Sequence, residues 1–130
     1  MPEWARLKSF DVESGTHKTP KATVVLEIDG KTVTHSGTGD GPVDAVYRTI
    51  AAMTQTKSKL LMFGVNAITG GTDAQGEVSV RVEEEGRTVS GHGADTDIIT
   101  ASARAYLNAL NKLAYIASKQ AEGIQKVSLI

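Results

Sequence analysis

The stretch VVLEIDGKTVTHSG (24–37) is echoed later in the chain by RVEEEGRTVSGHG (81–93), which places Gly30 and Gly86 56 positions apart. The same spacing, applied without a gap, pairs further identical residues, and the paired glycines fall where turns are expected. We therefore interpret the chain as two copies of one supersecondary unit. The other matched pairs are Gly15 with Gly71, Thr16 with Thr72, Val24 with Val80, Thr32 with Thr88, Val33 with Val89, Gly37 with Gly93, Ala45 with Ala101 and Arg48 with Arg104.

Each copy is predicted to contain three antiparallel strands. KATVVLEI (21–28) alternates apolar and polar faces with the period of two that is typical of a half-buried strand. Asp29-Gly30, and Glu85-Gly86 in the second copy, are expected to form two-residue hairpin turns, which need positive φ angles. The predicted strands are 6–14, 21–28 and 31–37 in the first copy, and 60–69, 77–84 and 87–93 in the second.

A helix is predicted after each set of strands. Pro42 suits the first position of a helix over 43–55, and Asp97 suits the N-cap of a helix over 98–120, which we expect Gly123 to end. The predicted fold class is α+β: two tandem βββα units (βββαβββα), antiparallel hairpins with the helices packed on one face. We expect a single domain over 1–130, with repeats of about 5–58 and 59–123.

Composition narrows the classes of function. The chain has 130 residues, which is the length of one domain, and 14 Lys and Arg against 15 Asp and Glu, so no basic excess favours nucleic acid. It has no cysteine, and its three histidines lie at no metal-ligand spacing. The longest apolar run is too short for a membrane span, and the amino terminus lacks the layout of a signal peptide. We expect a cytoplasmic protein without metal, cofactor, membrane or nucleic-acid partner.

The segment GTGDGP (37–42) raises the question of a phosphate loop. Dinucleotide loops need GxGxxG between a strand and a helix of a parallel βαβ unit, and P-loops need GK[ST]; this segment has GxGxG after an antiparallel hairpin. Nucleotide binding is therefore disfavoured. Gly37 and Gly93 occur in both copies, and we interpret them as residues that turn the chain from strand to helix.

Gly39 and Gly41 are specific to the first copy, because the repeat sets Asp95 and Asp97 opposite them. A helix N-terminus flanked by residues without Cβ atoms offers free N–H groups, which suit a carboxylate as well as a phosphate. Asp40, between the two glycines, could meet an ammonium group, so the turn has the chemistry to bind an α-amino acid. The alternative is that Asp40 is only a cap or a solvated turn residue.

Three stretches, GTGDGPVDAVYRTI (37–50), VNAITGGTDAQGEVSV (65–80) and GHGADTDIITASARAYLNALNKL (91–113), together resemble the C-terminal regulatory domain of 2-isopropylmalate synthase. The resemblance runs from about Arg6 to Leu113. It implies a βββαβββα domain that forms a homodimer, binds L-leucine between its halves or subunits, and transmits feedback inhibition to a catalytic TIM barrel. That barrel, with its HxH metal site, is absent from this chain, so we expect no catalytic residues and no acyl transfer here.

The resemblance also implies which residues would bind the effector. The turn before the first helix would form one wall, the first strand of the second copy would surround the leucine side chain, and residues before the second helix would complete the site. For Leu60 and Phe63 the alternative is an ordinary core position, and for Asp44 it is a favourable first-turn charge. The predicted effector-binding residues are Gly39, Asp40, Gly41, Val43, Asp44, Ala45, Leu60, Phe63, Ala67, Ala74, Ala94 and Asp95.

Two other functions compete with leucine sensing. Citramalate synthases carry a similar domain that responds to isoleucine, and isomeric aliphatic side chains differ by only about 1–3 kcal/mol in a hydrophobic pocket. DTDIITASARAYLNALN (95–111) favours the isopropylmalate branch. The last alternative is a dimerisation module without a ligand, in which the glycines serve packing alone.

Overall fold

Three strands followed by one helix occur twice along the chain, as the repeat predicts. The computed structural model describes residues 3–68 and 75–128, with side chains for 3–66 and 75–121. The elements, in chain order, are β1 (Ala5–Gly15), β2 (Lys18–Ile28), β3 (Lys31–Thr38), α1 (Pro42–Thr54), β4 (Lys59–Ile68), β5 (Gln75–Glu84), β6 (Arg87–Asp95) and α2 (Ile98–Ser128).

The strands form two separate antiparallel sheets, ordered β1-β2-β3 and β4-β5-β6. The second and third strands of each sheet are joined by the predicted tight hairpins. Asp29 and Gly30 have φ angles of 51° and 78°, and Glu85 and Gly86 have φ angles of 50° and 79°. Positive φ at both central residues is the mark of a type I′ turn, so this prediction is confirmed in both copies.

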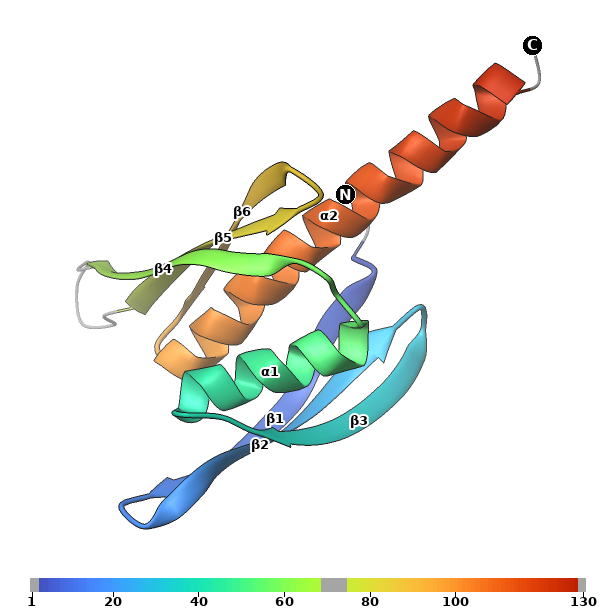
Figure 1. Ribbon diagram of the computed structural model, residues 1–130. Helices are drawn as coiled ribbons and strands as arrows, with labels where there is room; N and C mark the ends of the chain where they lie inside the picture. Colours follow the sequence, from blue (N-terminus) through green and yellow to red (C-terminus); the bar gives the residue numbers. More distant parts are fainter. Residues whose placement is uncertain (1–2, 69–74, 129–130) are drawn as a thin grey trace.

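The helices lie between the two sheets (Figure 1). α1 packs on β2 and β3, α2 packs on β5 and β6, and the helices contact each other. The sheet faces and the helix faces that meet each other supply the fully buried side chains of the core, among them Val24, Leu26 and Ile50 in the first unit and Val80 and Val82 in the second. Over the described residues, neither helix has a stretch apolar and long enough to cross a bilayer.

Gly37 and Gly93 do not turn the chain, contrary to the expectation from sequence. Both lie within strands, in β3 and β6. A Cβ on Gly37 would lie 2.6 Å from the Thr49 hydroxyl, and one on Gly93 would collide with the Ala101 carbonyl of α2. Both glycines therefore allow a helix to pack unusually close to the third strand of its own sheet.

The gap-free repeat is also wrong for the first strands. Leu7 faces Leu26 and Leu60 faces Val82, so the second strands are 56 positions apart (82 − 26) but the first strands only 53 (60 − 7). The registers each contain a bulge at the same place, after Leu7 and after Leu60. In the structure Phe63 thus corresponds to Phe10, which faces Val24 as Phe63 faces Val80.

The second helix does not end at Gly123. α2 continues to Ser128, so the expected stop is passed without a break in the helix. A glycine inside a helix costs about 1 kcal/mol relative to alanine, and the residues that follow Gly123 include no proline to end the helix. The last turns of α2 extend beyond both sheets (Figure 1).

Candidate functional site

The start of α1 has free hydrogen-bond donors. Gly41 is the N-cap residue, with an extended backbone (φ −158°, ψ 175°) and no side chain to accept from the first turn. The first helical bond runs from the Ala45 N–H to the Gly41 carbonyl (2.9 Å). In this turn, all of which is described, the N–H groups of Gly41, Val43 and Asp44 donate no hydrogen bond. These donors lie at the positive end of the helix dipole, where an anion is favoured.

The start of α2 has no such vacancy, because Asp97 caps it. The Asp97 carboxylate accepts from the N–H groups of Ile99 (3.3 Å) and Thr100 (3.2 Å). It also accepts from the Thr100 hydroxyl (2.7 Å). This bond is the main reason that the pKa of Asp97 is lowered, and the two backbone bonds contribute less. The predicted N-cap is confirmed, and the two helix starts differ as Gly41 and Asp97 differ in sequence.

Two acidic side chains of the α1 turn have different surroundings. Asp44 accepts from the Asp40 N–H (2.8 Å) and forms an ion pair with Arg48 Nε (2.9 Å), so its carboxylate helps to hold the turn itself. The Asp40 side chain is 94% exposed and lies 3.6 Å from Arg48 Nη2. Asp40 therefore has the carboxylate with more room to meet a cation from solvent.

Gly39 and Ala45 form the tightly packed floor of the turn. A Cβ on Gly39 would lie 2.5 Å from the Ala45 backbone nitrogen and 2.7 Å from Asp44 Oδ2. The Gly39 N–H donates to the Pro20 carbonyl (3.1 Å), and Ala45 is fully buried. Around Gly41, in contrast, a Cβ would meet no atom within 4 Å. Of the two glycines specific to this turn, only Gly39 is required by packing.

Three aromatic rings join β4 to both helices. Phe63 of β4 meets Tyr47 of α1 edge-on, with ring centroids 6.0 Å apart, and Tyr47 stacks on Tyr106 of α2 at 4.6 Å. The Tyr47 hydroxyl donates to the Ser102 carbonyl (2.9 Å), and burial raises the Tyr47 pKa. Phe63 thereby lies against α1, the helix whose N-cap is Gly41. The sequence-based site omits Tyr47 and Tyr106, although helical spacing places each on the apolar face of its helix.

The other predicted site residues are more scattered. Leu60 lies on β4 and is 45% exposed, and Ala94 and Asp95 end β6. The Asp95 carboxylate accepts from the Asp97 N–H (2.9 Å) and from Arg104 (3.1 Å), so it holds the turn before α2. Within the described residues α1 packs on the first sheet and α2 but not on the backbone of β4 or β6. Ala67 lies in β4 without a described side chain, and Ala74 lies outside the described residues.

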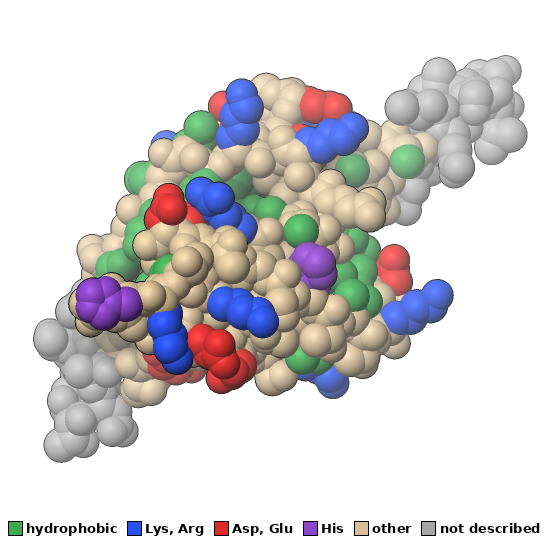
Figure 2. Space-filling model, turned by 60° about the horizontal axis from the view of Figure 1, so that its bottom comes forward, with side chains coloured by type: hydrophobic (Ala, Val, Ile, Leu, Met, Phe, Trp, Pro, Cys, Tyr) green, Lys and Arg blue, Asp and Glu red, His purple; other side chains and the backbone are tan. Residues whose placement is uncertain are grey.

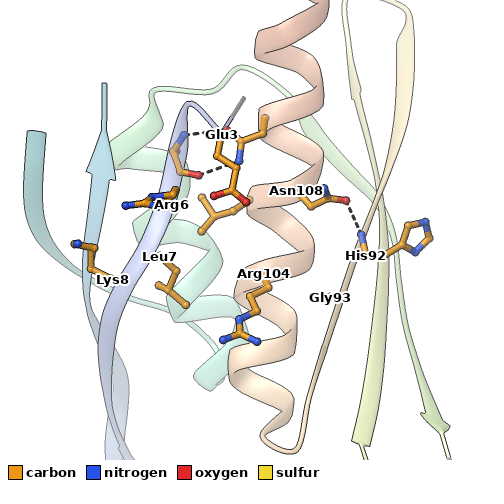
Figure 3. A pocket seen from close by; sticks show the side chains of 11 residues that line it. Glu3, Arg6, Leu7, Lys8, His92, Gly93, Arg104 and Asn108 are labelled. Carbon is orange, nitrogen blue, oxygen red and sulfur yellow. Dashed lines mark hydrogen bonds between the residues drawn. The ribbon is translucent and has the colours of Figure 1, made fainter. Parts of the chain in front are cut away.

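A groove of about 730 Å³, which sequence did not predict, lies between β1, β6 and α2 (Figure 3). Its cations already have partners: Arg6 and Lys8 pair with Glu27, at 2.9 and 3.4 Å, and Arg104 pairs with Asp95. The hydrogen bond from Arg6 is the main reason that the pKa of Glu27 is lowered. With its charges compensated, the groove has no excess charge that selects a ligand.

The described side chains and the face drawn in Figure 2 show no feature that selects a metal or a polyanion. Among the described side chains, no three histidine, aspartate or glutamate residues gather in a metal-binding group. On the face drawn in Figure 2, Lys and Arg side chains are interspersed with Asp and Glu rather than gathered in one patch. The candidate site is therefore the α1 turn, together with Tyr47 of the same helix and Phe63 of β4, which contacts Tyr47.

Comparison with known proteins gives one consistent result. Residues 2–114 match the family described as the LeuA allosteric (dimerisation) domain. The chain is 53% identical over 111 residues to 2-isopropylmalate synthase of Aromatoleum aromaticum, covering 85% of this chain and 22% of that enzyme. It is 51% identical over 111 residues to the enzyme of Syntrophus aciditrophicus, with the same two shares. It is 50% identical over 113 residues to that of Crocosphaera subtropica (86% and 21%), so it spans about a fifth of these relatives.

Proposed function

Because the chain belongs to the LeuA allosteric (dimerisation) domain family, we propose that it senses L-leucine as the regulatory domain of a 2-isopropylmalate synthase. In this proposal the domain forms a homodimer and transmits feedback inhibition to the catalytic TIM barrel of the same enzyme. The chemistry of acyl transfer belongs to that barrel, so this chain needs neither a cofactor nor catalytic residues of its own.

The observation that carries the proposal is the uncapped start of α1. The N–H groups of Gly41, Val43 and Asp44 are free to bind the carboxylate of an amino acid, while Asp97 fills the same place at α2 with its own carboxylate. A carboxylate from solvent would thus cap the start of α1 as the Asp97 carboxylate caps the start of α2.

The other two parts of an α-amino acid also have candidate partners. The exposed Asp40 carboxylate is a partner for the ammonium group, and the ring of Phe63, which is 40% exposed, offers apolar surface for an aliphatic side chain. Leu60 lies on the same face of β4 as Phe63, because their partners Val82 and Val80 are both core residues of β5. These features support an amino acid with an aliphatic side chain as the effector class.

Isothermal titration of the chain with leucine, isoleucine and valine tests the proposal. We expect the strongest binding for leucine; stronger binding of isoleucine would instead indicate the effector of a citramalate synthase. No heat with any of the three, at millimolar ligand, would leave only the ligand-free dimerisation module.

A pair of glycine variants locates the binding. Gly41→Ala places a methyl group where the carboxylate must approach the backbone, so we expect it to abolish binding. Gly15→Ala is the matched control, since its added Cβ meets only the Lys18 side chain at ordinary contact distance, and it should bind as the wild type does. Equal affinity in both variants would exclude the α1 turn as the carboxylate site.

A further inference from the structure

The edge strand β4 exposes a concentrated strip of large apolar side chains. Five of the eight exposed large apolar residues in the described part of the chain lie within it, each between 40% and 51% exposed. β4 is an outer strand of its sheet, so its free edge also presents unpaired backbone groups. We call this surface the β4 strip; it consists of Leu60, Leu61, Met62, Phe63 and Val65.

The corresponding strand of the first unit shows that the fold alone does not require this strip. In the observed registers, Leu61 and Met62 of β4 correspond to Lys8 and Ser9 of β1. The chain therefore has apolar residues in the second unit where polar residues serve in the first. A strand that is apolar on both faces is typical of one buried on both faces.

The cover over the two strands differs as well. Both helices pack against β1, and Leu7, Phe10 and Val12 are partly buried against the core. In the described part of the chain neither helix packs on the backbone of β4, and the equivalent residues Leu60 and Phe63 stay exposed apart from the ring contact of Phe63 with Tyr47. The second unit thus lacks, over its first strand, the cover that the first unit has.

The size of the strip fits a protein partner. Since a large apolar side chain presents on the order of 150–200 Å² when fully exposed, five that are about half exposed offer roughly 400 Å². Patches of this size on monomers are often functional, and a standard interface buries about 800 Å² per partner, a little over half of it apolar. The strip would supply the apolar centre of such an interface.

We propose that the β4 strip is the surface on which a second copy of this chain docks, with the two β4 strands antiparallel across a two-fold axis near Met62. The proposal rests on the homodimer proposed above and specifies its interface. An exposed strand edge can pair with an identical antiparallel edge. In a two-fold contact the same surface of both subunits meets, so the β4 strip of one copy would contact the β4 strip of the other. The strip centres on Met62, so the axis passes close to that side chain.

Charge substitution at Met62 tests the interface. Sedimentation velocity of Met62→Glu and of Met62→Lys should each show the dimer dissociation constant raised at least about 30-fold, because two like charges are forced together in a desolvated contact. Ser9→Glu and Ser9→Lys are the matched controls, since Ser9 is the corresponding exposed position of β1, and they should remain as dimeric as the wild type. Circular dichroism verifies that all four variants are folded.

Mixing the two Met62 variants tests whether the strip meets itself. An equimolar mixture should form dimers again, because Glu and Lys then face each other across the axis. A mixture that stays monomeric would overturn the two-fold contact, and a Met62→Glu variant as dimeric as the wild type would overturn the interface while leaving the homodimer intact. A wild-type chain that is monomeric at tens of micromolar would overturn both the interface and the homodimer.

Discussion

At the scale of single residues, two glycines of the same turn have different roles. Gly39 lies against the backbone of Ala45, where any side chain would collide, whereas Gly41 has open space around its Cα. The φ angle of Gly41 is −158°, an extended value that any residue adopts. Backbone strain therefore does not explain why glycine stands at either position. Tight packing explains Gly39. Gly41 differs in that open space around it leaves the free N–H groups accessible to a ligand.

Stability measurements should separate these two glycines. We expect Gly41→Ala to cost at most about 1 kcal/mol in the free energy of unfolding, because alanine fits there but is a poor N-cap. Gly39→Ala should cost more than about 2 kcal/mol, since the added Cβ lies 2.5 Å from a backbone nitrogen that cannot move without the helix. Urea unfolding at one protein concentration measures both, and equal losses would contradict the packing role of Gly39.

Asp97 makes a pH-dependent contribution through its cap. Its pKa in the folded chain is lowered below the usual 3.8, so the stabilisation is complete above that value and is lost as the pH falls through the folded-state pKa. Asp97→Ala should cost about 1 kcal/mol at pH 7, and this difference should shrink below pH 4. Asp97→Asn, a neutral cap, should retain most of the stability at pH 7. Unfolding free energies at pH 7 and pH 3 check this prediction. If Asp97→Ala had the same cost at both pH values, the ionised carboxylate could not be the source of the stabilisation.

Sequence predicted part of the candidate site and missed part, for a physical reason. The turn residues 39–45 are local, so glycine, proline and helix-start patterns reveal them. The contact between Phe63 and Tyr47 joins residues of different units and depends on how α1 and β4 meet, which no local pattern specifies. Tyr47 shares an apolar stripe of α1 with Val43 and Ile50, and such a stripe indicates that the side chain faces inward but not what it contacts.

At the scale of elements, the buried side chain of Asn111 in α2 is one of the connections between the two units. The Asn111 amide donates to the Ala5 carbonyl and accepts from the Ala5 N–H, both at 2.9 Å. Ala5 begins β1, so this pair of bonds fixes the second helix to the first strand. The two bonds satisfy backbone groups that water reaches poorly, since Ala5 is 1% exposed.

Removing this link should be costly. Asn111→Ala leaves the buried N–H and carbonyl of Ala5 without partners, and we expect a loss of about 2–4 kcal/mol in the free energy of unfolding. Asn108→Ala is the control one turn earlier on the same helix, because its amide accepts only the exposed His92 N–H and should cost about 1 kcal/mol or less. Urea unfolding compares the two; equal losses would show that Asn111 contributes only as a helix residue.

The elements themselves were largely predictable. Strand alternation, two Xaa-Gly hairpins and the helix starts at Pro42 and Asp97 are short-range signals, and the structure confirms them. Two errors share a cause, because both needed information beyond the local pattern. The offset between β1 and β4 is fixed by pairing with the next strand, and α2 passes Gly123 because a single glycine does not end a helix without a suitable turn after it.

At the scale of the whole molecule, the two units have different unsatisfied features. The first has a helix start without a cap, and the second has an edge strand without a cover. Phe63 and Tyr47 connect the two elements that carry these features, since β4 meets α1 through their rings. A ligand that binds at the start of α1 and touches Phe63 would therefore contact both units. Such a ligand shifts an equilibrium only by its different affinity for two arrangements, typically by 1–3 kcal/mol.

Hydrogen exchange with and without leucine tests this bridging. At a leucine concentration of 100 times the dissociation constant, mass action should raise the free energy of unfolding by about 2.7 kcal/mol and raise the melting temperature accordingly. Backbone amides near Val43 should be protected because their N–H groups bind the carboxylate, and those near Phe63 because the side chain of the ligand covers that ring. Lys31, just after the Asp29-Gly30 hairpin, is the internal control and should change only with global stability. Protection at one of the two segments alone would exclude the bridging ligand even if leucine binds, because a ligand that contacts one unit has no direct means to move it against the other.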